Sequence, residues 1–315
     1  MLGDAGVTIE DARRFLVAHV GPSVAAVELV GEGAWSRCFG YRHRGDDLVI
    51  RFGQTLEFFE KDRRATAFAG PGLPVPTVHE IGPAFDGHFA ISARVRGEPL
   101  ENLPAAQWPA MVPNLLTVLD ALRTADVSDT SGWGSWDATG QGTQPSWRDF
   151  LLHVGDDLPG ERTYGWREKL AASPVQDDVF PEGFALVAAL AEAAPPERYL
   201  VHADLVNRNV LVDDGRITGV FDWGCGLYGD FLYELAWLKF WSPWYPGLAS
   251  RDIVEDVRRH LTERGVAVPD FDARLRGCLL HVGLNHHAWC VTVEDFDSLV
   301  RVNQQTRALI EGSVL

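Results

Sequence analysis

Residues 202–224 read HADLVNRNVLVDDGRITGVFDWG. The segment places a carboxylate at Asp204 and an amide at Asn209, and a second carboxylate follows at Asp222. Between them, two short apolar runs flank the step Asp214-Gly215, which is a strong hairpin-turn signal. Isolated His-x-Asp triplets occur by chance, but the whole string is far more specific. Carboxylate and amide oxygens in this order are the groups that phosphoryl transfer requires.

Each polar residue of the segment has a predicted role. Asp204 would orient the attacking hydroxyl and accept its proton. Asn209 and Asp222 would hold Mg²⁺, which prefers oxygen ligands and keeps several waters. We interpret His202 as an organiser of the loop that aims Asp204, not as a base. Asn207 lies close to Asp204 in the sequence and is a candidate contact to the acceptor.

The sequence on either side of this segment predicts an α+β fold in two lobes. Residues 1–96 alternate short β-rich runs (25–30, 38–41, 48–52 and 88–95) with two helical stretches (7–19 and 56–69). From Gly97 onward, long helical patterns dominate (about 105–124, 181–193, 230–240, 250–264 and 272–290). We therefore expect a small antiparallel β lobe over residues 1–96 and a larger, mainly helical lobe over residues 97–315. Clefts between lobes are common ligand sites.

The β lobe carries two features that fit nucleotide binding. Residues 31–36 read GEGAWS after a predicted strand. Gly31 and Gly33 would let a hairpin lie close over phosphates, and Ser36 would offer a hydroxyl; a plain β-turn explains the same residues. Arg51, on the strand 48–52, would offer phosphates a forked cation, and an ordinary charge at a strand end is the alternative.

Tryptophans are dense between residues 133 and 147 and between 237 and 245. Sugar rings stack on aromatic faces, and ammonium groups are attracted to them. Burial in the core is the competing interpretation of each ring, and it suits Trp237 best. Asp126 and Asp230 are candidate partners for ammonium groups, although Asp230 fits a helix cap better.

The composition narrows the classes of partner. The chain has 315 residues and a net charge of −16, which disfavours nucleic acid and anionic membranes and suits a cationic small molecule. Many proteins are acidic for solubility alone, and this explains the charge without any cationic partner. The four cysteines form no CxxC pair, and the first residues lack the apolar region of a secretory signal. We expect a cytoplasmic protein, monomeric, with reduced thiols. The spacing of His281, His286 and His287 does not fit a metal site on one helix face.

Several local strings resemble the aminoglycoside phosphotransferase family, whose fold is related to the protein kinases. They are SGWG at 131–134, WRDF at 147–150, LVHAD at 200–204, DGRIT at 214–218 and FWSPW at 240–244. The resemblance implies ATP (or GTP) and Mg²⁺ as cofactors and an aminoglycoside as acceptor, with hygromycin B the best match. It further implies that adenine bonds the backbone of Ala93 and Val95, and that Trp241 and Trp244 border the antibiotic.

The chain departs from the family pattern at one point. Arg51 stands where most members carry a lysine, and the position of its glutamate partner falls on Lys61, between Glu60 and Asp62. The carboxylate partner of Arg51 is therefore left open. Two other functions also remain open: a kinase of another aminoglycoside, a macrolide or a small metabolite, and a non-catalytic nucleotide-binding module. The retention of Asp204, Asn209 and Asp222 argues against the last of these.

Overall fold

The computed structural model describes residues 6–33, 36–175, 178–193, 195 and 197–312. Within these residues the chain forms two compact units. The first contains the described residues up to Leu100 with residues 137–140 and 207–225, and the second contains residues 101–136, 141–206 and 226–312. No helix among the described residues is long and apolar enough to cross a membrane. All four cysteines are free thiols, as expected.

The first unit is built on a five-stranded antiparallel sheet with the strand order β1-β2-β3-β5-β4. The strands are β1 (Ala25–Glu32), β2 (Ser36–His43), β3 (Asp46–Gly53), β4 (Val78–Ala84) and β5 (Gly87–Ala93). Strand β4 was not predicted, because its sequence contains a glycine and a proline. It lies at the sheet edge, where a proline is tolerated.

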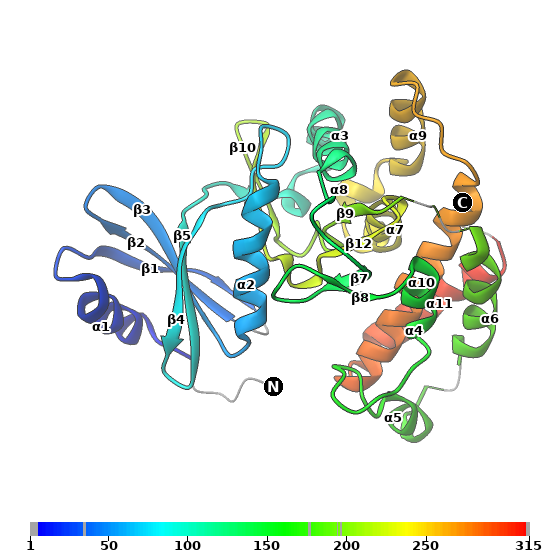
Figure 1. Cartoon of the computed structure of the whole chain (residues 1–315), viewed down its shortest axis with the longest axis horizontal. Coiled ribbons are helices and arrows are strands. Elements are labelled where there is room, and N and C mark those ends of the chain that lie inside the picture. Colours follow the sequence, from blue (N-terminus) through cyan, green and yellow to red (C-terminus); the bar gives the residue numbers. More distant parts are fainter. Residues whose placement is uncertain (1–5, 34–35, 176–177, 194, 196, 313–315) are drawn as a thin grey trace. The chain divides into compact units, whose positions relative to one another are not determined.

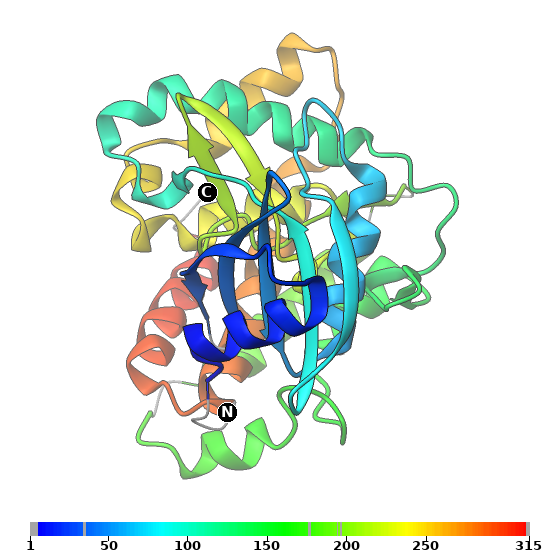
Figure 2. The same cartoon turned by 90° about the vertical axis from the view of Figure 1, so that its left-hand side faces the viewer.

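Two helices cover opposite faces of this sheet: α1 (Ile9–Val20) and α2 (Leu56–Ala65), which continues into the 3₁₀ turn η1 (Thr66–Phe68). Figures 1 and 2 show α1 on one face and α2 on the other. Helix α1 buries Ala12 and Leu16 against the strands. The strand residues in the same core are Val27, Phe39, Tyr41, Ile50, Phe52, Ala84, Phe89 and Ile91. Because side chains alternate along a strand, Ile50 and Phe52 face α1, and Arg51 faces α2.

The predicted hairpin is present and belongs to the first unit. Strands β10 (Val210–Asp213) and β11 (Arg216–Val220) are joined by Asp214 and Gly215, both with positive φ, as a tight two-residue turn requires. The short strand β6 (Glu98–Pro99) pairs with β10. We had expected the hairpin in the C-terminal lobe of residues 97–315, but its contacts group it with the sheet that precedes it.

The second unit is mainly helical. Its helices are α3 (Trp108–Thr124), α4 (Trp147–His153), α5 (Trp166–Ala172), α6 (Phe180–Leu190), α7 (Leu232–Trp241), α8 (Pro246–Ala249), α9 (Ile253–Glu263), α10 (Phe271–Thr292) and α11 (Phe296–Ile310). The five long helices predicted from the sequence are confirmed, with ends that differ by at most three residues. Helices α4, α5, α8 and α11 were not predicted.

Helix α10 is the centre of the second unit. It packs against α5, α6, α7 and α11 and is buried along most of its length. A helix surrounded on all sides needs apolar residues on all sides. A four-stranded sheet lies in the same unit, with the order β8-β7-β12-β9. Its strands are β7 (Trp133–Trp136), β8 (Gly142–Gln144), β9 (Tyr199–Val201) and β12 (Leu227–Gly229).

Candidate active site

Asp62 of α2 is the carboxylate partner of Arg51. The Arg51 guanidinium donates a hydrogen bond to Oδ2 of Asp62 and forms an ion pair with it. Lys61 points elsewhere, and its Nζ donates to the carbonyl oxygen of Gly224 at 3.2 Å. Successive residues on a helix differ by about 100° in direction. The carboxylate therefore lies one position beyond the place where the family pattern suggested it, and this answers the question that the sequence left open.

Asp62 also connects the strand β3 to the turn that carries Asp222. Its Oδ1 accepts a hydrogen bond from the backbone amide of Trp223 at 2.8 Å. The Nη1 of Arg51 lies 3.8 Å from Oδ1 of Asp222. Burial raises the pKa of Asp62 to about 6, whereas Arg51 and the Trp223 amide favour its ionised form. At neutral pH the arrangement is therefore one buried cation between two carboxylates.

Asp222 remains accessible within this group. Its side chain is 48% exposed, compared with 14% for Arg51 and 13% for Asp62. Asp222 has a φ of 64°, in the left-handed region that non-glycine residues rarely adopt. Such conformations gather at functional sites. The accessible carboxylate beside a buried arginine is suited to hold a cation that also contacts phosphate.

The hairpin pairing brings Asn209 and Asp222 to the same end of β10 and β11. Val210 pairs with Val220, and the amide of Phe221 donates to the carbonyl oxygen of Asn209 at 3.0 Å. Asn209 is buried. Among the described residues, no three His, Cys, Asp or Glu side chains form a group that would hold a metal. A magnesium site made of the Asn209 amide oxygen and the Asp222 carboxylate stays a prediction.

The other predicted nucleotide contacts are also in the first unit. Gly31 lies within β1, the amide of Gly33 donates to the carbonyl oxygen of Ser36 at 3.0 Å, and Ser36 begins β2. The two residues between them, Ala34 and Trp35, lie outside the described residues. Ala93 ends β5. Val95 follows it and packs closely against the hairpin strand β11 at Gly219. Their roles toward a nucleotide stay predictions.

The predicted catalytic loop lies in the second unit. Strand β9 leads into His202, which is fully buried, and Asp204 is half-buried. Between them, Ala203 has a φ of 57°. The amides of His202 and Ala203 both donate to Oε2 of Glu234, at 2.7 and 3.0 Å. His202 and Asp204 therefore belong to the second compact unit, and Asn209 and Asp222 belong to the first.

The tryptophans near the end of α7 form a continuous aromatic cluster. Trp241 and Trp244 are half-buried and cross edge to face, with ring centroids 5.0 Å apart. The ring of Trp244 also stacks on that of Phe240, with centroids 6.1 Å apart. The ring of Trp241 packs edge to face against that of His286, with centroids 4.6 Å apart. Trp237 is only 5% exposed, which confirms the expectation that it belongs to the core. The two half-buried rings are the ones that a ligand could reach.

The indole Nε1 atoms of Trp237 and Trp241 are buried, and neither has an acceptor among the residues that the structure describes. Buried indole N–H groups usually have a partner. Water beside the cluster is the available acceptor for these two donors.

The remaining acidic candidates differ in burial. Asp230 is 1% exposed, accepts the amide of Leu232 at 3.0 Å and forms an ion pair with Arg274 at 2.7 Å. It is a structural residue just before α7, although the N-cap position that was expected of it is occupied by Phe231. Asp126 is exposed and accepts the amide of Ser128 at 2.9 Å. Asn207 is exposed with a φ of 65°. Contacts of Asp126 and Asn207 to an acceptor stay predictions.

The three histidines of α10 face different partners. His281 meets the hydroxyl of Tyr233 at 2.9 Å, and burial lowers its pKa to about 3. His286 bonds the carbonyl oxygen of Val282, and His287 bonds Asn303. Each histidine thus has a structural contact within its own unit.

Sequence reasoning missed Glu234. The signal was present: residues 232–238 read LYELAWL, so that one carboxylate stands within an apolar helix. Buried carboxylates need specific partners. The sequence did not show that the partners of Glu234 are the backbone amides of His202 and Ala203.

Comparison with known proteins places the chain among relatives of closely similar length. The family model described as "Phosphotransferase enzyme family" matches residues 45–265. Hygromycin-B 4-O-kinase of Escherichia coli is 32% identical over 312 residues, which span 97% of this chain and 86% of the relative.

Solved structures agree with this match. Aminoglycoside phosphotransferase APH(4)-Ia aligns with a TM-score of 0.83 and 30% identity, covering 96% of this chain and 99% of that chain. A thermostable mutant of the same enzyme, in ternary complex with AMP-PNP and hygromycin B, aligns with a TM-score of 0.81 and 32% identity, covering 95% and 97%. These alignments confirm the fold class predicted from the sequence.

Proposed function

The chain belongs to the phosphotransferase enzyme family, and from this membership we propose that it transfers the γ-phosphoryl group of ATP to hygromycin B. The observation that carries the proposal is the 32% identity to Hygromycin-B 4-O-kinase along 97% of the chain. The proposed acceptor is the hydroxyl at position 4, the position in that relative's name. ATP is the proposed donor because a related structure holds AMP-PNP together with hygromycin B.

In this proposal, Asp204 orients the acceptor hydroxyl and receives its proton as the phosphoryl group is transferred. His202 holds the loop. Arg51 contacts the phosphates, with its charge supported by Asp62. Gly31, Gly33 and Ser36 cover the phosphates, and the backbone of Ala93 and Val95 binds the base.

Magnesium fits the residues proposed for it. Asn209 and Asp222 supply an amide and a carboxylate oxygen, which are hard ligands, and the 48% exposure of Asp222 leaves room for phosphate oxygens and water. When bound, Mg²⁺ would neutralise charge on the phosphates. The protein's own part is to hold these two oxygens at the open end of the β10–β11 hairpin.

The acceptor side of the proposal rests on Trp241 and Trp244. Both rings are half-buried within an aromatic cluster. The net charge of −16 suits a polycationic antibiotic. Asp126 is exposed and ionised, because its hydrogen bonds with Ser128 lower its pKa, so it is available to an ammonium group.

One assay tests the function directly. Purified protein with ATP and Mg²⁺ is tested for ADP release against hygromycin B, kanamycin, gentamicin, a macrolide and choline. Of these five acceptors, we expect only hygromycin B to cause ADP release. ³¹P NMR of the product should show a phosphate ester. Release with a different acceptor would replace the proposed substrate, and release with none would favour a nucleotide-binding module. Sedimentation of the same preparation checks the expected monomer.

Truncation of Trp241 or Trp244 to alanine should raise KM for hygromycin B. Loss of one ring contact to a cationic sugar costs about 0.5–2 kcal/mol, which corresponds to roughly 2–30-fold in KM. KM for ATP should hardly change, because the proposed nucleotide contacts lie in the first unit. Steady-state kinetics with each substrate varied in turn provides the measurement.

Trp237→Ala is the matched comparison, because Trp237 belongs to the same cluster but is buried. Removing a buried aromatic ring costs about 3–5 kcal/mol of folding free energy. That variant should lose thermal stability and all activities together. If Trp241→Ala and Trp244→Ala behave in the same way, the two rings belong to the core and not to the antibiotic site.

Asp62→Ala should weaken both nucleotide binding and folding. The substitution leaves the guanidinium of Arg51 buried without its partner, and breaking a buried ion pair costs about 3–5 kcal/mol. It also removes the acceptor for the Trp223 amide. Urea unfolding and the KM for ATP should both change. Glu60→Ala is the control, because Glu60 lies on the same helix but pairs with the exposed Arg63. Equal effects in the two variants would contradict the role of Asp62.

A further inference from the structure

Arg198 is a half-buried arginine to which the proposed reaction gives no role. It immediately precedes β9, the strand that leads into the loop of Asp204. Its Cζ lies 5.6 Å from the ring centroid of Tyr228, a fully buried residue of β12. A guanidinium that rests on an aromatic ring directs its N–H donors outward in one plane. The acceptors of those donors all lie in one segment of the chain.

That segment is residues 127–132, between α3 and β7. Nη1 of Arg198 donates to the carbonyl oxygen of Gly132 at 2.7 Å and to the hydroxyl of Thr130 at 3.2 Å. Nη2 donates to the carbonyl oxygens of Thr130 at 2.7 Å and Val127 at 3.4 Å. One planar guanidinium thus joins three positions of a short segment. A lysine, with one terminal nitrogen, would not match this set of acceptors.

Within this segment, residues 127–130 form a turn that closes on itself. The amide of Thr130 donates to the carbonyl oxygen three residues earlier at 3.1 Å, and the amide of Ser128 donates to Oδ1 of Asp126 at 2.9 Å. Among the described residues, the hydrogen bonds that connect the turn with more distant parts of the chain come from Arg198. Arg198 therefore holds the turn within the second unit.

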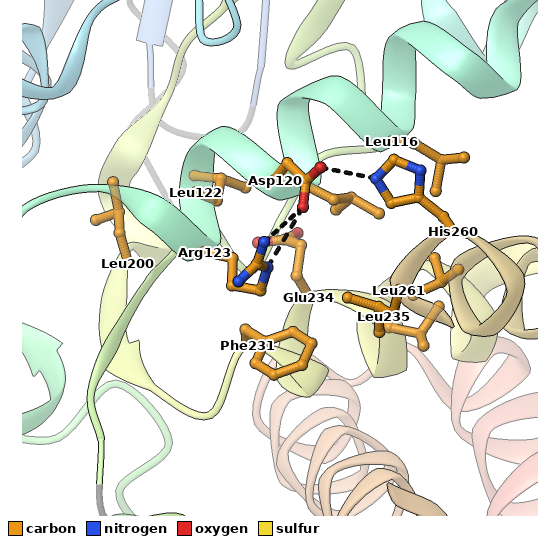
Figure 3. Close-up of a pocket in the computed structure, with 12 residues that line it drawn as sticks. Leu116, Asp120, Leu122, Arg123, Leu200, Phe231, Glu234, Leu235, His260 and Leu261 are labelled. Carbon is orange, nitrogen blue, oxygen red and sulfur yellow. Dashed lines mark hydrogen bonds and ion pairs between the residues drawn. The ribbon is translucent and has the colours of Figure 1, made fainter. Parts of the chain in front are cut away.

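The helix that precedes the turn has a separate anchor. Figure 3 shows Asp120 of α3 bonded to both His260 of α9 and Arg123, at 2.7 and 3.0 Å. These contacts lie within α3 and do not include residues 127–130. They fix the end of the helix and leave the position of the turn to Arg198.

The contacts of Arg198 leave the acidic side chains of the segment free for a ligand. Asp126 and Asp129 are both exposed. The guanidinium donates to carbonyl and hydroxyl oxygens and not to these carboxylates. A carboxylate on a fixed backbone binds a cation with less loss of conformational entropy than one on a mobile loop. This effect concerns Asp126 most directly, because it is the proposed partner of an ammonium group and precedes the turn.

We propose that Arg198 is a positioning residue for the acceptor: it holds the turn of residues 127–130 and thereby fixes how Asp126 meets an ammonium group of a cationic acceptor. The inference rests on the proposed function in assigning Asp126 to the acceptor. Because Arg198 also precedes the strand that leads to Asp204, one side chain connects the acceptor turn with that strand.

Arg198→Met keeps the apolar length of the side chain and removes the donors. KM for hygromycin B should rise roughly two- to fivefold, the scale on which one exposed ion pair contributes. KM for ATP should not change, because the proposed nucleotide contacts lie in the first unit. Arg198→Lys keeps the charge with fewer donors, so its KM for hygromycin B should lie between those of the wild-type protein and Arg198→Met.

Arg276→Met is the matched control. Arg276 also donates to backbone carbonyl oxygens, those of Leu309 at 3.0 Å and Ile310 at 2.9 Å, but at the end of α11. A comparable loss of thermal stability is expected in both variants. KM for hygromycin B should rise only in Arg198→Met, and an equal rise in Arg276→Met would show that general destabilisation is the cause and overturn the inference.

A double-mutant cycle tests whether Arg198 acts through Asp126. Asp126→Asn should raise KM for hygromycin B by a factor similar to that of Arg198→Met. The double variant should then resemble Asp126→Asn alone, because the turn no longer has a carboxylate to position. An unchanged KM in either single variant, or factors that multiply in the double variant, would overturn the inference.

Hydrogen exchange separates this inference from the proposed function, because it needs no substrate. The amides of Ser128 and Thr130 should exchange faster in Arg198→Met than in the wild-type protein and in Arg276→Met. Wild-type exchange in Arg198→Met would overturn the inference for any acceptor. If Arg198→Met does not fold, Arg198→Lys decides: wild-type exchange together with a wild-type KM for hygromycin B overturns it equally. Faster exchange in a protein that is inactive on hygromycin B would support the hold of Arg198 on the turn and refute only the substrate.

Discussion

Asp204→Ala is expected to lower kcat for hygromycin B phosphorylation by about 10²–10⁴-fold, the range that a positioned general base contributes. The residue would orient the acceptor hydroxyl and take its proton, and no other carboxylate lies within the segment 202–209. Affinity for ATP should stay near the wild-type value, because Arg51, Asn209 and Asp222 are unchanged. Steady-state kinetics and calorimetric titration with AMP-PNP measure the two quantities separately.

Two further variants make this prediction more specific. Asp204→Asn keeps the shape of the side chain and removes the base, so it should be nearly as inactive as the alanine variant. Asp213→Ala removes an exposed carboxylate from the neighbouring hairpin and should have no effect on kcat. A kcat for Asp204→Ala within tenfold of the wild-type value would remove Asp204 from the catalytic role.

Asp222→Ala should abolish the magnesium-dependent part of nucleotide affinity and lower turnover with it. The proposed Mg²⁺ ligand is lost, and the arginine 3.8 Å away loses its second carboxylate neighbour. We expect Kd for ATP in the presence of Mg²⁺ to rise at least about tenfold, or about 1.4 kcal/mol. Without Mg²⁺, affinity should be unchanged or slightly higher, because a negative charge near the phosphates has been removed. Calorimetric titration of ATP with and without Mg²⁺ measures the magnesium-dependent and the magnesium-independent affinity separately.

The matched variant for this prediction is Asp214→Ala, in the exposed turn of the same hairpin. It removes the same charge at the far end of β10 and β11, where no phosphate contact is proposed. Unchanged magnesium-dependent affinity in Asp222→Ala would contradict the assignment of this carboxylate to the metal. An equal loss in Asp214→Ala would point to general electrostatics instead of coordination.

At Arg51 and Asp62 the residues differ from the family pattern, but the ion pair between a strand cation and a helix carboxylate is kept. A cation on the central strand β3 and a carboxylate on α2 form a buried pair, with arginine in the place of the usual lysine. The longer, forked arginine side chain contacts Asp62 and also lies 3.8 Å from Asp222. A lysine has one terminal nitrogen and would not match both carboxylates with the same planar geometry.

The sequence by itself determined the elements whose signals are local. The Asp214-Gly215 step specified a tight hairpin, because both residues tolerate the left-handed backbone that this turn requires. The amphipathic helix α9 followed from the 3.6-residue period of its apolar side chains, whereas α10 is buried along most of its length. The candidate residues Asp204, Asn209 and Asp222 were found in the same way, since their spacing lies within one continuous stretch of chain.

Only the tertiary structure decided which distant groups meet. Asp62 and Trp223 are 161 positions apart, and Glu234 bonds amides more than 30 positions away. Neither pairing has a local signature, because it depends on how α2 packs against the 3₁₀ turn η5 (Trp223–Cys225) after β11 and how α7 packs against the loop after β9. Composition and period indicate that a residue is apolar or charged, but the residues opposite it come from elements that the chain brings together only when it folds.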